Sequence, residues 1–142
     1  MRFMVLLKAT AETEAGVPPS TEILEAMGQY NEELVKAGVL LAAEGLQASS
    51  KGARIKFSGG KHSVTDGPFA ETKELIAGFW ILAVKSKAEA VEWSSRCPHP
   101  FGTGDVEIEI RQVFEAADFG PELTEKQRES EERLRAQVDA KR

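Results

Sequence analysis

The chain has 142 residues, of which 42% are hydrophobic and 29% charged, and its formal net charge is −5 at pH 7. This length fits a single domain with a sizeable core, and no apolar run is long enough to cross a membrane. Acidic and basic residues are mixed along the chain, which argues against the clustered basic face of a direct nucleic-acid binder. Composition therefore indicates a globular protein without nucleic-acid or membrane partners.

Two features of the sequence indicate the compartment. The apolar run in residues 1–8 is too short for a signal peptide and is typical of a first strand. The single cysteine, Cys97, excludes an internal disulfide and fits a reducing environment. We therefore expect a cytoplasmic location.

The first part of the chain alternates strand, helix and strand. Residues 2–8 indicate a strand, and a polar loop follows. Ser20 or Thr21 then caps a helix, in which apolar residues recur at helical spacing until Gly38. Residues 39–44 form a second apolar strand.

The second part begins with an inserted hairpin and then repeats the strand–helix–strand pattern. Gly59-Gly60 supplies a tight turn between two short alternating segments. Residues 76–84 are almost continuously apolar, which predicts a central strand buried on both faces. A capping box opens a helix over residues 86–96, and residues 105–111 alternate strictly as a last strand.

This order predicts an α+β fold, a ferredoxin-like βαββαβ domain with an inserted β-hairpin. Residues 1–115 form the domain, and residues 116–142 are a charged C-terminal helical extension. Two helices cover only one face of such a sheet, and the other face requires a cover of its own. We therefore predict a homodimer in which two sheets meet face to face.

The segment Asp66-Gly67-Pro68-Phe69 links the hairpin to the predicted central strand. Glycine adopts backbone angles that other residues avoid, whereas proline fixes φ and lacks an N–H. The Asp66 carboxylate has two possible roles here. It either caps the turn through backbone N–H groups, or it serves as a general base beside a cleft.

Residues 66–74 are similar to the signature of the DGPF group of YCII-related proteins. Several separate segments agree with that group in the same order, namely residues 44–47, 49–53, 78–80, 89–93 and 96–98. The resemblance extends from residue 1 to about residue 115, and the charged tail lies outside it.

The resemblance implies a dimeric α+β barrel in which two ferredoxin-like sheets face each other. Related barrels include small-molecule isomerases, monooxygenases, haem enzymes and ligand-sensing modules, so the fold does not select a function. Members of the group are associated with extracytoplasmic-function sigma factors. A His–Asp pair is proposed as catalytic in the broader YCII group. Its histidine lies in the first helix, where this chain has Met27, Gln29 and Tyr30, which weakens the transfer of that pair.

Three residues are candidates for acid–base chemistry. Asp66 is the first, and His62 lies on the same side of its strand, although four strand residues span about 13 Å. Glu44 ends an apolar strand, where an unpaired buried carboxylate would be costly. Glu44 either pairs with a cation such as Lys73 or Arg96, or faces a ligand cavity.

Further side chains are candidates for lining a substrate pocket, each with an ordinary structural alternative. The aromatic candidates are either pocket walls or core, and Lys73 belongs either to a ligand-binding cluster or to a solvated loop. His99 lies between two prolines, either at the barrel mouth or simply in a turn. The pocket candidates are Tyr30, Phe69, Lys73, Phe79 and His99.

The sequence contains no spacing typical of a zinc site, phosphate loop or dinucleotide fingerprint, so we expect no metal and no cofactor. Two functions remain. In the first, the protein binds an unknown small molecule in a barrel pocket and acts as a cofactor-independent enzyme through carboxylate acid–base chemistry. In the second, it is a non-enzymatic ligand-sensing or interaction module with a functional link to an extracytoplasmic-function sigma factor.

Overall fold

The computed structural model describes residues 1–141. The chain divides into two compact units, the first Met1–Gln112 and the second from Val113 onward.

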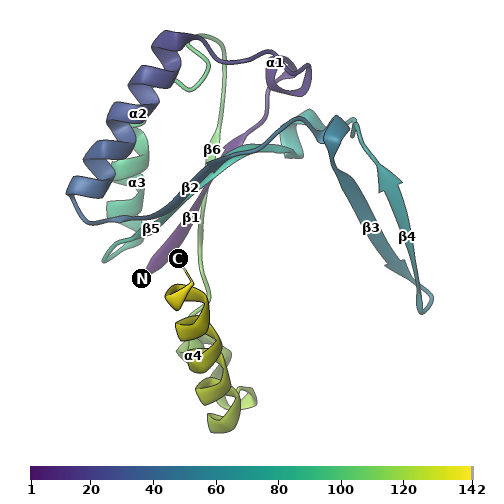
Figure 1. Cartoon of the computed structure of the whole chain (residues 1–142), viewed down its shortest axis with the longest axis vertical. Coiled ribbons are helices and arrows are strands. Elements are labelled where there is room, and N and C mark those ends of the chain that lie inside the picture. The colour runs from purple at the N-terminus through teal and green to yellow at the C-terminus, as the bar shows by residue number, and fades with distance from the viewer. Residues whose placement is uncertain (142) are drawn as a thin grey trace. The chain divides into compact units, whose positions relative to one another are not determined.

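The first unit is built on a four-stranded antiparallel sheet. Its strands are β1 (Arg2–Lys8), β2 (Leu40–Gly45), β5 (Ile76–Ala83) and β6 (Ile108–Gln112), in the spatial order β2-β5-β1-β6 (Figure 1). Each strand–helix–strand unit skips one strand of the sheet, which is the ferredoxin-like topology. The predicted α+β fold class is confirmed.

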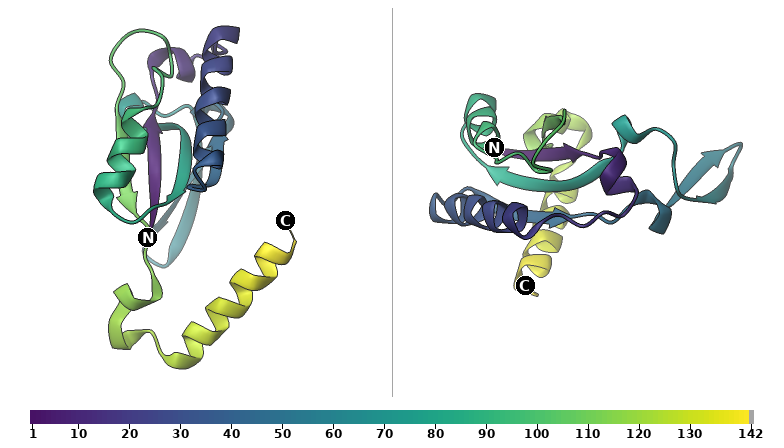
Figure 2. Two further views of the ribbon diagram at one scale, coloured as in Figure 1. Left: turned by 90° about the vertical axis from the view of Figure 1, so that its left-hand side faces the viewer. Right: turned by 90° about the horizontal axis from the view of Figure 1, so that it is seen from above.

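Helices α2 (Thr21–Lys36) and α3 (Lys87–Ser95) lie together on one face of this sheet, and a one-turn helix, α1 (Ala11–Glu14), precedes them (Figure 2). Serines at the predicted positions begin both long helices. The Ser20 hydroxyl accepts the Ile23 N–H, and the Ser86 hydroxyl accepts the Glu89 N–H. These caps satisfy N–H groups that have no partner inside the helix.

The core lies between the two helices and the sheet. Alternate residues of β1 and β5 are buried on this side, and Leu34 of α2 is completely buried. Tyr30 packs edge-on against Trp80, with ring centroids 6.0 Å apart. The buried apolar residues are Phe3, Val5, Leu7, Tyr30, Leu34, Val39, Trp80, Leu82, Val84 and Ala90.

The opposite face of the sheet has no helix of the first unit against it (Figure 2). We refer to it as the open face. Its centre is apolar and half-buried, with Met4 and Leu6 from β1 beside Phe79 and Ile81 from β5. The sequence predicted burial of β5 on both faces, and this is wrong for the single chain because α2 and α3 cover one face only.

The inserted hairpin forms a separate two-stranded sheet, β3 (Ala53–Ser58) and β4 (Lys61–Asp66), and its residues are all exposed. Gly59 and Gly60 join the strands, both with positive φ, as a tight hairpin turn requires. The hairpin and the two long helices lie on opposite sides of the four-stranded sheet (Figures 1 and 2).

The last strand begins later than predicted. Its pairing with β1 starts at Ile108, opposite Leu7, whereas the alternating pattern predicted a start at Asp105. The carbonyl of Glu107 still accepts the Lys8 N–H at 3.1 Å, but the chain before it belongs to a glycine-rich loop. Alternation therefore identified the two faces of the strand and not its beginning.

The second unit contains a 3₁₀ segment (Ala116–Glu122) and α4 (Glu125–Ala140). Phe114 and Phe119 stack with ring centroids 4.9 Å apart, and Thr124 caps α4 through the Gln127 N–H. Two further 3₁₀ turns, Ser49–Lys51 and Thr72–Glu74, belong to the first unit. Within residues 1–141, no helix is long and apolar enough to cross a membrane.

Replacing Leu34 by alanine should lower the free energy of unfolding by about 2–5 kcal/mol, because a completely buried leucine leaves a cavity. The matched control is Val35→Ala on the same helix, where the side chain is 62% exposed and the expected change is below about 0.5 kcal/mol. Urea unfolding of both variants checks this. Equal losses would contradict the packing described above.

Candidate functional site

We refer to the segment Asp66-Gly67-Pro68-Phe69 as the motif. Its Gly67 packs directly against the backbone of a loop that is distant in the sequence. A Cβ at this position would lie 1.8 Å from the carbonyl oxygen of Ser49, so no other residue fits without moving the backbone. The Gly67 N–H also donates to the Gly52 carbonyl at 3.0 Å. The glycine therefore holds the end of β4 against the 3₁₀ turn that precedes β3.

Ser49 joins the motif to the N-terminal part of the chain. Its hydroxyl accepts the Phe69 N–H at 3.0 Å and donates to the Glu14 carboxylate. The Ser49 N–H donates to the same carboxylate at 2.9 Å. Three segments far apart in the sequence thus meet at one serine.

Arg54 covers the outer side of the motif. Its guanidinium carbon lies 3.9 Å from the centre of the Phe69 ring, and it forms an ion pair with Glu71 at 3.2 Å. A hydrogen bond from the backbone of Glu71 itself, and then the Arg54 guanidinium, lower the pKa of the Glu71 carboxyl. Phe69, a predicted pocket residue, is therefore stacked beneath an arginine.

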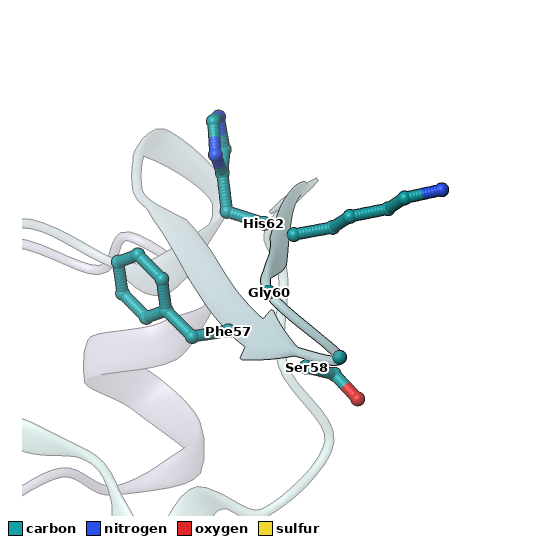
Figure 3. A pocket seen from close by; sticks show the side chains of 6 residues that line it. Phe57, Ser58, Gly60 and His62 are labelled. Atoms are coloured by element: carbon teal, nitrogen blue, oxygen red, sulfur yellow. The ribbon is translucent and has the colours of Figure 1, made fainter.

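Asp66 lies at the last position of β4 and is exposed. Within residues 1–141, its carboxylate accepts no hydrogen bond and forms no ion pair, so it does not cap the turn. The structure also does not bring Asp66 into contact with His62. The His62 ring instead lies beside Phe57, with ring centroids 6.3 Å apart (Figure 3).

Glu44 and Phe79 are brought together. They are opposite each other in the pairing of β2 with β5, and paired residues share one face of a sheet. Because Trp80 faces the core, its neighbour Phe79 faces the other way, onto the open face. Glu44 is exposed, and it forms no ion pair among the described residues, while Arg96 pairs with Glu92 at 2.7 Å.

The open face also carries charged groups on the strands away from Glu44. Glu109 of β6 lies opposite Leu6 and pairs with Lys8 at 3.4 Å and with Arg111 at 3.3 Å. The hydrogen bond from Arg111, followed by the charge of Lys8, lowers the pKa of the Glu109 carboxyl. An apolar centre thus lies between the unpaired carboxylate of Glu44 and a compensated charge cluster.

Tyr30 lies on the other side of the sheet. Its hydroxyl donates to the Trp93 carbonyl at 2.8 Å, and burial raises the pKa of the phenol well above its ordinary value. Since Tyr30 packs on Trp80 in the core, it does not share a face with Glu44 and Phe79. Lys73 is exposed in its 3₁₀ turn and forms no ion pair within residues 1–141.

His99 organises its own loop. The Phe101 N–H donates to Nδ1 at 3.1 Å, so Nε2 carries the proton and donates to the Gly104 carbonyl at 2.8 Å. Both ring nitrogens therefore bind backbone groups and are not available to a ligand in this arrangement.

Two surface concavities accompany these residues. A groove of about 710 Å³ lies between α3 and β6 and is lined mainly by apolar side chains. The hydroxyl of Ser94 also lines it and has no hydrogen-bond partner within residues 1–141. A concavity of about 460 Å³ lies at the tip of the hairpin (Figure 3). His99 lines the first and His62 the second, and neither includes Glu44 or Asp66.

Sequence reasoning missed three partners of the motif, Glu14, Ser49 and Arg54. The segment that contains Ser49 did stand out in the family resemblance, but no local pattern indicated that Ser49 or Arg54 contacts the motif. Glu14 lies 35 residues from Ser49 and carries no local signal. Within residues 1–141, no three His, Cys, Asp or Glu side chains are grouped to hold a metal ion.

Replacing Gly67 by alanine should destabilise the first unit by at least about 1–3 kcal/mol, because the new methyl group overlaps the Ser49 carbonyl. Gly45→Ala is the matched control, since a Cβ there meets nothing within 4 Å. Thermal unfolding of both variants provides the comparison. A Gly67→Ala variant as stable as the control would show that the contact is not present in solution.

Cys97 should react slowly in the folded protein. Burial raises the pKa of its thiol to about 11, and the thiol lies 3.9 Å from the sulfur of Met27. Near pH 8 the reactive thiolate is therefore about a hundredfold scarcer than in an unfolded chain. Alkylation by iodoacetamide should be correspondingly slower in buffer than in urea, and should accelerate as the pH rises toward the folded pKa. Similar rates in both solvents would contradict the burial.

Comparison with known proteins identifies the family of this chain. The model of the YCII-related domain matches residues 1–117. An uncharacterized protein of Rhizobium meliloti (strain 1021) is 32% identical over 72 residues, which cover 51% of this chain and 58% of that protein. The resemblance inferred from the motif is thus confirmed at the level of the family. This chain belongs to the family of YCII-related domain proteins.

Proposed function

We propose that this protein binds a small molecule against the open face of its four-stranded sheet, with a second copy of the chain closing the site. The observation that carries the proposal is the juxtaposition of Glu44 with Phe79 beside the apolar centre of the open face. A sheet face with large apolar side chains gains free energy when water is removed from it. Two such faces brought together would enclose a space between two sheets.

Glu44 supplies the polar recognition in this proposal. An unpaired carboxylate at the border of an apolar surface suits a ligand that has a hydroxyl, amide or amine group attached to an apolar body. Once a second copy limits water access, the same carboxylate can accept and return a proton. The reaction class that fits is a cofactor-independent proton transfer, such as an isomerisation.

A non-enzymatic sensing module linked to sigma-factor-dependent transcription is the second candidate function. The observation that favours it is that both concavities are open to solvent and neither contains Glu44 or Asp66. A sensor requires only that ligand binding changes an interaction with another protein. Ligand binding without turnover would favour this function over the first.

The test is a thermal-shift screen of a metabolite library against the wild-type protein. A ligand present at 100 times its dissociation constant stabilises the folded state by about 2.7 kcal/mol, which raises the melting temperature by several degrees. Glu44→Gln should weaken binding at least about tenfold, because a charged hydrogen-bond acceptor is lost.

Glu32→Gln is the control, since this exposed glutamate lies on α2 and away from the open face. It should bind the same compounds as the wild type. A screen without any stabilising compound, or equal binding by Glu44→Gln and wild type, would contradict the proposed site.

A further inference from the structure

The β3–β4 hairpin exposes a set of large apolar side chains on one of its faces. Register places Ile55 opposite Val64 and Phe57 opposite His62, so all four share that face. Ile55 is 58% exposed, Val64 60% and Phe57 81%. Figure 3 shows Phe57 and His62 on one side of the hairpin and Ser58 on the other. We refer to Ile55, Phe57 and Val64 as the apolar stripe.

An isolated two-stranded hairpin is marginally stable in water, and it gains stability when one face packs against another surface. Six residues per strand make this arm about 20 Å long. Every residue of both strands is exposed, so the first unit does not itself cover the stripe. Three neighbouring apolar side chains on one face of an exposed arm mark a site for a protein partner.

The charge of the arm indicates which partner it contacts. Residues 53–66 contain Arg54, Lys56 and Lys61 but only one acid, Asp66, which gives the arm a net charge of +2. Because the whole chain has a net charge of −5, the remaining residues together carry −7. A basic arm on an acidic body is complementary to another copy of the same body.

The position of the arm also indicates a second copy of the chain as the partner. The arm extends from the body on the side of the open face, opposite to α2 and α3 (Figures 1 and 2). If the open face of a second copy packs against the open face of this chain, the second copy lies on the side to which the arm projects. The base of the arm is fixed by the Gly67 and Ser49 contacts described above, which maintain this direction.

We propose that each copy of the chain clasps the other with its hairpin, so that the apolar stripe of one protomer packs on the body of its partner. This inference rests on the homodimer of the proposed function and adds a second, reciprocal contact to it. Twofold symmetry makes the two arms equivalent, so one substitution removes the contact twice in each dimer.

The test is sedimentation equilibrium of the full chain and three variants. Phe57→Ser should raise the dimer dissociation constant at least tenfold, because the most exposed residue of the stripe is lost from both arms. Val64→Ser, on the other strand, should act in the same direction. Thr65→Ala is the matched control on the opposite face of the hairpin, and it should leave the constant unchanged. Circular dichroism should be identical for all four proteins, since none of the substituted side chains is in the core.

A fourth variant, Leu6→Ser, separates this inference from the proposed function, since Leu6 lies on the open face. If Leu6→Ser weakens the dimer and neither Phe57→Ser nor Val64→Ser does, the arm contact is overturned and the sheet contact is supported. A dimer weakened by the two stripe variants but not by Leu6→Ser would support the arm and overturn the sheet contact. A monomeric wild-type protein at micromolar concentration would overturn both.

Discussion

Helices α2 and α3 cover only one face of the four-stranded sheet, and the proposals made above depend on this one-sided cover. Side chains alternate along a strand, so β1 and β5 each supply one row to the core and one row to the open face. Helices α2 and α3 pack on the first row only. The second row has an apolar centre that includes Leu6 and Phe79 and is only half-buried. Removing water from this surface is the favourable contribution that a partner or a ligand would make.

The Asp66-Gly67-Pro68-Phe69 motif has a structural role, because it connects the hairpin to the loop before β3 and to the start of β5. Gly67 allows the backbone to approach Ser49, and Ser49 in turn binds both Phe69 and Glu14. These contacts fix where the hairpin leaves the body and where β5 begins. The motif thus sets the geometry of two surfaces, the exposed arm and the open face, without supplying the carboxylate that we assign to ligand binding.

Much of the fold could be predicted from local patterns. Serine caps, the Gly59-Gly60 turn and the alternation in the last strand each depend on residues close together in the sequence, and each has a specific physical cause. The burial of β5 could not be predicted, because an almost continuous apolar run does not reveal whether one or two layers cover it. Its open row has an apolar centre, and helices α2 and α3 do not cover it.

The candidate site was less accessible to sequence reasoning, because it depends on which face each residue occupies. Glu44 and Phe79 lie 35 positions apart, and only the register of β2 with β5 brings them together. Tyr30 and Phe79 were equally plausible pocket residues in the sequence, yet they lie on opposite sides of the sheet. The partners of the motif, Glu14 and Arg54, were missed because their contacts are long-range and carry no spacing pattern.

The central claim is that two open faces meet. Isotope-filtered NMR on a sample that mixes labelled and unlabelled chains measures contacts between different copies directly. The account predicts intermolecular NOEs that involve the side chains of Met4, Leu6, Phe79 and Ile81, all of which lie on the open face. A sample in which these side chains give only intramolecular NOEs, with the mass of a monomer, would contradict it.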